Sequence, residues 1–318
     1  MSAVLPIIYP DLETAKAVVE DPQTANIPEL HKAVFRWLEI FVKHSSRASK
    51  DSVDELKALG ASDSDLAACL QLASTQVWLT SSADASGVGI DDSYVNFAPP
   101  LLQRDASFYR ATQEVYADTE RRTGPSAASG AAPHGWLAAP CSGESYEVAA
   151  SAACSRYGMV PNLFAAVSAS PDFYPRQQLA LDLLERPQSG ELSASMHALV
   201  RAATVALNQC DYFVPTVKAL LELRSEREIN YAELVPDPMA VASNDQERVV
   251  LAFADKLIRN PYKITEKDAM GFRAVGLNDV AYVDVYNTVA IQTSLDRLAN
   301  CIGVLPDSRA LLTLSKAY

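Results

Sequence analysis

The chain has 318 residues, of which 49% are hydrophobic and 21% charged, a composition typical of a globular protein and not of a disordered or fibrous one. Its formal net charge of −12 argues against nucleic acid as a partner, because phosphate backbones are bound by clustered Lys and Arg. The N-terminus carries no basic segment followed by a long apolar run, and no apolar stretch is long enough to cross a bilayer. These features predict a cytoplasmic protein without nucleic-acid or membrane partners.

Cysteine and histidine are too scattered to indicate a metal centre or a disulfide framework. No two of the five cysteines stand at Cys-x-x-Cys spacing, and the four histidines are equally dispersed. We therefore expect no metal site and no cofactor. The residues concerned are Cys69, Cys141, Cys154, Cys210, Cys301, His31, His44, His134 and His197.

In chain order, the first predicted helices recur near the C-terminus. Residues 34–88 align without a gap with residues 250–304, and each segment reads as three amphipathic helices. The second helix ends at Gly60 or Gly276, and Asp63 or Asp279 stands where the third needs an N-cap. Because both pairs of capping residues are separated by the same number of residues, they predict an internal duplication. Chance similarity is the alternative, since the identities between the two segments are few.

Between the two copies lies a stretch with the composition of a flexible connector, residues 123–133. We predict an N-terminal lobe at 1–122, a linker at 123–143 and a C-terminal lobe at 144–318. Apolar residues spaced by three and four predict further helices at 195–210 and 280–302, and a helix-like run at 101–122 is a candidate for the first lobe's counterpart of the Cys210 helix. Because no alternating strand pattern competes, the predicted fold class is all-α with two related lobes.

Three stretches of the second lobe resemble a known family. They are Gly-Met-Val-Pro-Asn-Leu-Phe at 158–164, Val-Ala-Leu-Asn-Gln-Cys at 205–210, and Asp-Arg-Leu-Ala-Asn-Cys-Ile-Gly at 296–303. Together they resemble the alkylhydroperoxidase D-like (AhpD-like), or carboxymuconolactone decarboxylase-like, family, in particular its peroxidase-related branch. The resemblance covers about residues 154–306 and implies a helical AhpD-like fold.

The resemblance also implies an active-site helix of the form Cys-x-x-Cys-x-x-x-His, of which little is left. Cys210 keeps the first position, Phe213 and Val217 hold the second cysteine and histidine positions, and the family's proton-relay glutamate falls on Ala198. In the family, these partners lower the pKa of the first thiol and resolve its sulfenic acid. His197 does not replace them, since we expect it on the solvated face of its helix.

Candidate catalytic residues are Cys210, Tyr212 and Arg297, and each has a structural alternative. Cys210 is a nucleophile or a buried remnant of ancestry, and Tyr212 is a proton donor or a core residue. Arg297 either clamps a substrate carboxylate or holds helix ends together. The predicted substrate-binding residues are Phe213, Val217, Thr293, Asn300 and His134, the last of which is either a lid residue or a solvated loop histidine.

Three functions remain open at this point. The first is a non-redox lyase, isomerase or cyclase acting on a small hydrophobic molecule, because the motif's ionisable positions are now apolar. The second is a residual single-cysteine alkylhydroperoxidase whose Cys210 is resolved by another thiol. The third is a non-catalytic ligand-binding or assembly protein. The expected partner is a small-molecule substrate, and a homo-oligomer is possible.

Overall fold

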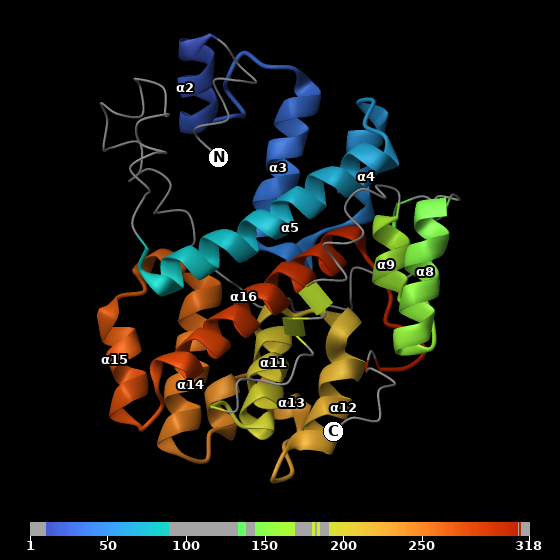
Figure 1. The fold of residues 1–318 in the computed structure, drawn as a ribbon. Coiled ribbons are helices and arrows are strands. Elements are labelled where there is room, and N and C mark those ends of the chain that lie inside the picture. Colours follow the sequence, from blue (N-terminus) through green and yellow to red (C-terminus); the bar gives the residue numbers. More distant parts are fainter. Residues whose placement is uncertain are drawn as a thin grey trace.

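The computed structural model describes residues 11–88, 133–137, 144–168, 180–181, 183–184, 191–310 and 312. Within these ranges the regular elements are α-helices and short 3-10 helices, which confirms the predicted all-α fold class. Figure 1 shows the two longest helices, α5 (Asp63–Ser86) and α16 (Asp279–Ile302), side by side across the middle of the molecule. In the part of the chain so described, every helix is too short or too polar to cross a membrane.

The remaining elements precede and surround this central pair. Before α5 come α2 (Leu12–Glu20), α3 (Glu29–Lys43), η1 (Ser45–Arg47) and α4 (Lys50–Ala58). Before α16 come α8 (Glu144–Tyr157), α9 (Asn162–Val167), α11 (Ala194–Asn208), η4 (Asp211–Phe213), α12 (Val214–Arg224), α13 (Tyr231–Leu234), η5 (Pro238–Val241), α14 (Asp245–Arg259), η6 (Pro261–Lys263) and α15 (Glu266–Ala274). The helix-like run at 101–122 lies outside the described residues.

The predicted repeat has matching element boundaries. The elements α3, η1, α4 and α5 correspond in order to α14, η6, α15 and α16. The two members of each pair have the same length, and their first residues are as far apart in sequence as Val34 and Val250. Gly60 and Gly276 both adopt the left-handed conformation expected of a helix C-terminus, with φ of 104° and 82°. This agreement supports the repeat at the level of secondary structure. Common ancestry of the two copies stays a hypothesis that superposition would test.

The predicted N-caps of the third helix were wrong by one residue in both copies. Ser62 caps α5 by accepting from the amide of Asp65, and Asn278 caps α16 by accepting from the amide of Ala281. Asp63 and Asp279 are instead the first helical residues, where a carboxylate is favoured by the positive end of the helix dipole.

The two copies pack together through the long helices. The hydroxyl of Ser74 donates to the carbonyl of Ser294 at 2.9 Å, and that of Tyr282 donates to the carbonyl of Ala85 at 2.6 Å, so α5 and α16 are antiparallel. The short turn η1 contacts α16, and its counterpart η6 contacts α5. Both predicted lobes therefore contribute to one hydrophobic core. Most of the predicted linker at 123–143 lies outside the described residues.

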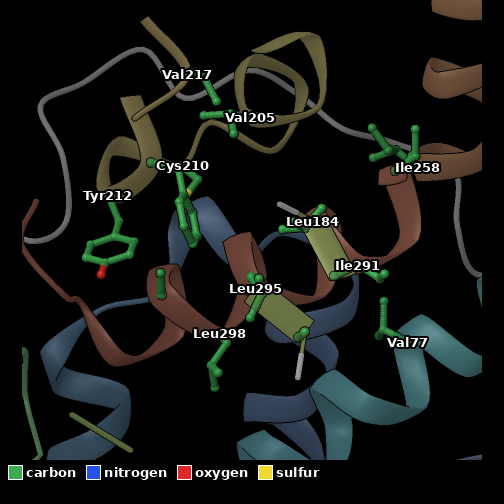
Figure 2. Close-up of a cluster of buried hydrophobic side chains, with 14 of the residues drawn as sticks. Val77, Leu184, Val205, Cys210, Tyr212, Val217, Ile258, Ile291, Leu295 and Leu298 are labelled. Carbon is green, nitrogen blue, oxygen red and sulfur yellow. The ribbon is translucent and has the colours of Figure 1, made fainter. Parts of the chain in front are cut away.

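Helix α11 is enclosed by other helices. It contacts α12, α14 and α16, and all of its residues from Met196 to Ala206 are buried. The expectation that His197 faces solvent was wrong: its side chain is 1% exposed, because α11 has no solvated face there. Figure 2 shows Val205 of α11 in a core cluster with Ile291 and Leu295 of α16 and Val77 of α5.

The short segment at 133–137 is fixed to the end of α16. The amide of Trp136 donates to the carbonyl of Ile302 at 2.9 Å, and the amide of Leu305 donates to the carbonyl of Pro133 at 3.3 Å. Gly303, which ends α16 with φ of 70°, lies under the Trp136 ring, and a Cβ atom there would be 2.2 Å from Cε2 of the indole. This contact places His134 near the end of α16.

Candidate active site

Cys210 stands at a break between two helices. Gln209 adopts a left-handed conformation (φ 50°), which ends α11, and Cys210 is extended before η4 and α12 begin. The thiol is 1% exposed and accepts hydrogen bonds from the backbone amides of Tyr212 and Phe213. In Figure 2, the core side chains around Cys210 come from α11, α12 and α16, namely Val205, Val217, Leu295 and Leu298.

The carboxyl group of Asp296, in the middle of α16, lies against this thiol. Asp296 is 0% exposed. Its Oδ1 accepts from Nε2 of Gln292 at 2.8 Å, its Oδ2 accepts from Nδ2 of Asn208 at 3.0 Å, and the Cys210 thiol donates a further hydrogen bond to it. A buried carboxyl group is tolerated when its oxygens are hydrogen-bonded in this way. The site is therefore a thiol–carboxyl pair held by two amides.

A buried cation extends the network. Arg201 of α11 is 2% exposed, and its Nε donates to Oε1 of Gln292 at 3.2 Å. The Gln292 amide thus accepts from the guanidinium on one side and donates to the Asp296 carboxyl group on the other. This orientation lets the charge of Arg201 favour the ionised form of Asp296.

Burial raises the pKa of Asp296 to about 7, and the hydrogen bonds from Gln292, Asn208 and Cys210 together with Arg201 limit the rise. Burial also raises the pKa of the Cys210 thiol well above its usual range, and the neighbouring charge of Asp296 raises it further. Near neutral pH the carboxyl group therefore gains and loses a proton while the thiol stays protonated. The pair is suited to acid–base chemistry and poorly suited to thiolate chemistry.

Asn208 connects the site to two predicted residues. Its Nδ2 also donates to Oγ1 of Thr293 at 3.2 Å, while Nδ2 of Asn300 donates to the Asn208 carbonyl at 3.1 Å. The same Asn300 amide donates to Oγ of Ser45 at 3.2 Å. The structure thus brings Cys210, Thr293 and Asn300 together, and the first copy supplies Ser45 to their surroundings.

Tyr212 and His134 belong to a neighbouring polar cluster around Asp307. The hydroxyl of Tyr212 donates to Oδ2 of Asp307 at 2.6 Å and accepts from the amide of Leu163 at 3.3 Å. The amide of Asn162 donates to Oδ1 of the same carboxyl group at 2.7 Å. Burial, followed by the charge of Asp307, raises the pKa of Tyr212. The charge of His134 lowers the pKa of Asp307, against the larger effect of burial, which raises it. Nδ1 of His134 is buried without a hydrogen-bond partner.

The other predicted residues lie in the core or face elsewhere. Arg297 donates from Nη2 to the carbonyl of Ile258 at 3.3 Å, in the last turn of α14, which is the structural role left open by the sequence. Its role as a carboxylate clamp stays a prediction. Phe213 and Val217 are both 0% exposed, and the Phe213 ring meets Tyr212 edge to face at a centroid distance of 4.7 Å. Both belong to the hydrophobic core, and their predicted role in substrate binding stays a prediction.

Sequence reasoning missed the residues that carry most of the polar contacts. These are Arg201, Asn208, Gln292, Asp296 and Asp307. The available signal was spacing: Gln292 and Asp296 are one turn apart on α16, and Arg201 and Asn208 two turns apart on α11. In the described part of the chain, no three His, Cys, Asp or Glu residues are grouped as metal ligands.

No protein-family model and no curated protein matches the sequence. Among solved structures, the chain is similar to an alkylhydroperoxidase AhpD core, an uncharacterised peroxidase-related protein from Ralstonia eutropha JMP134. The two are 23% identical over 56% of this chain and 95% of that one, with a TM-score of 0.49. An uncharacterised peroxidase-related protein from Silicibacter sp. TM1040 is 23% identical over 51% and 83%, with a TM-score of 0.44. At this identity the likeness concerns the fold alone.

Proposed function

We propose that the protein is a non-redox enzyme of the lyase, isomerase or cyclase type that moves a proton on a small hydrophobic substrate, with Asp296 as general acid–base. The observation that carries the proposal is a fully buried carboxyl group in hydrogen-bond contact with Cys210 and two amides. A pKa of about 7 gives such a group both protonation states at neutral pH, which general acid–base catalysis requires.

Each neighbour has a separate role in this chemistry. Ionised Asp296 removes a proton from carbon, and protonated Asp296 returns one to another atom of the same substrate. Arg201, through Gln292, stabilises the ionised form, while the Asn208 amide and the Cys210 thiol hold the carboxyl group in place. Because the pair is buried, a substrate has to displace neighbouring side chains, which favours a small apolar molecule.

The peroxidase alternative has less support. Peroxide reduction needs a thiolate, and both burial and Asp296 raise the pKa of the Cys210 thiol. Phe213 occupies the position from which a second thiol would resolve the sulfenic acid. The remaining alternative is that the network around Asp296 is purely structural. The following experiment distinguishes this alternative from the proposed enzyme.

Exchange of carbon-bound hydrogen for solvent deuterium tests the proposal even while the substrate is unidentified. The protein is incubated in D₂O with a panel of small apolar ketones, lactones and unsaturated acids, and exchange is followed by mass spectrometry. Asp296→Asn should lower the exchange rate of any responding compound by about 100-fold or more. Asp279→Asn, an exposed carboxyl change on the same helix, should leave it unchanged. Exchange that survives in Asp296→Asn would remove Asp296 from the reaction.

A further inference from the structure

The polar cluster around Asp307 fixes the segment that follows α16. This segment, residues 304–309, has no regular secondary structure, and we call it the C-terminal strap. The Asp307 carboxyl group accepts from the Tyr212 hydroxyl at 2.6 Å and from the Asn162 backbone amide at 2.7 Å. The Asn162 side chain in turn donates to two carbonyls of the strap, at 3.1 and 3.4 Å. The strap is thus bound to η4, which holds Tyr212, and to the start of α9.

Tyr212 connects the strap to the Cys210 site. The backbone amide of Tyr212 donates to the Cys210 thiol, and its ring packs edge to face against Phe213. Its hydroxyl accepts from the amide of Leu163, in addition to its bond with Asp307. In Figure 2, Tyr212 lies at the edge of the cluster that surrounds Cys210. Tyr212 is therefore joined to the thiol by its backbone and to the strap by its side chain.

The other sides of the site are harder to open. The core side chains around Cys210 come from α11, α12 and α16, whose backbone groups are hydrogen-bonded within each helix. By contrast, the strap's backbone amides make two backbone hydrogen bonds with described residues, to the carbonyls of Ala299 and Pro133. Local opening starts where backbone hydrogen bonds are few. The Tyr212 side of the site should therefore open first.

We propose that the Tyr212–Asp307 hydrogen bond is the latch of an entry route, and that its breaking lets Tyr212 and the strap separate and a small molecule reach Cys210 and Asp296. Cys210 is 1% exposed and Asp296 is 0% exposed, so a ligand needs an opening to reach either of them. The route is independent of the proposed function, because it concerns the entry of a molecule and not its conversion.

Labelling of the Cys210 thiol with iodoacetamide measures the opening. In the closed state the thiol is buried and burial raises its pKa, so it reacts only in the fraction of molecules that are open. Tyr212→Phe removes the latch and keeps the ring, and should raise the labelling rate about tenfold through the loss of one hydrogen bond to a carboxylate. Asp307→Ala, which also removes the contact with Asn162, should raise it further. Peptide mass spectrometry reports each cysteine separately.

Two controls distinguish the latch from a general loss of stability. Tyr282→Phe, in the first turn of α16, also removes a hydroxyl that donates at 2.6 Å, and should leave the labelling of Cys210 unchanged. Cys301 is 0% exposed and reports the opening of the whole core. We expect Tyr212→Phe to raise labelling at Cys210 and not at Cys301. An equal rise at both thiols, or no greater rise at Cys210 than in Tyr282→Phe, overturns the latch.

Hydrogen exchange of the wild-type protein provides a test that needs no variant. The amides of Asn162 and Leu163 donate to the side chains of Asp307 and Tyr212, so they exchange with solvent deuterium when the latch opens. The open fraction obtained from these amides should equal the open fraction obtained from Cys210 labelling. Open fractions that differ beyond the errors of the two measurements would place the entry elsewhere and overturn the proposal.

Discussion

The helices α5 and α16 hold matching positions in the two aligned segments but lie in different environments. Both are 24 residues long, and each ends at a left-handed glycine. In α16, one face is covered by α11 and is buried, whereas among the described residues the matching face of α5 is exposed. The matched pairs are Gln76 with Gln292, Leu79 with Leu295, and Thr80 with Asp296. The comparison teaches that the covering helix α11, and not the geometry of the long helix, produces the buried polar network around Asp296.

One difference between the copies is expected at their terminal glycines. Gly303→Ala places a Cβ atom 2.2 Å from the Trp136 ring, whereas Gly87→Ala meets nothing within 4 Å. Both changes strain a left-handed residue, which costs about 1 to 2 kcal/mol. We expect Gly303→Ala to lower the free energy of unfolding by a further 2 kcal/mol or so. Urea denaturation of both variants measures the difference, and equal losses would mean that the Trp136 contact is absent.

A difference of similar size is expected at the matched leucines. Leu295 is 1% exposed and Leu79 is 55% exposed. Leu295→Ala should therefore cost about 3 kcal/mol of unfolding free energy, and Leu79→Ala about 0.5 kcal/mol or less. The same denaturation assay applies. A large loss in Leu79→Ala would show that this face of α5 is covered in solution.

The third difference is a trend with pH at the matched polar position. The pKa of Asp296 is raised from 3.8 to about 7, so in that interval the folded protein keeps a proton that the unfolded chain loses. The free energy of unfolding should fall by about 1.4 kcal/mol per pH unit from about pH 4 to about pH 7, relative to Asp296→Asn, and then level off. Thr80→Asp should add no such trend because position 80 is exposed. If the difference in free energy of unfolding between wild type and Asp296→Asn did not change with pH, the pKa of Asp296 would be the same in the folded and unfolded protein.

The helices could be predicted because their signals are local. Apolar spacing and the glycines at 60, 87, 276 and 303 depend on a few neighbouring residues, and the structure places helix ends there. The site could not be predicted because its partners meet only after folding, as Asn208 and Asp296 do. Sequence reasoning chose Arg297 as the catalytic residue of α16, but one position rotates a helical side chain by about 100°. Asp296 faces Cys210, and Arg297 faces α14.

The antiparallel pair also bears on how the chain could be divided. The two long helices, at 63–86 and 279–302, pack against each other. The segment at 133–137 is held at the end of α16 by backbone hydrogen bonds. Lys57 of α4 also binds this segment, because its Nζ donates to the Trp136 carbonyl at 3.2 Å. A cut between positions 88 and 133 would leave two fragments, each with half of the interface and an uncovered apolar helix. Neither fragment is expected to fold alone, and mixing them should restore one core. The shared interface thus predicts complementation between two fragments, as in a split reporter protein.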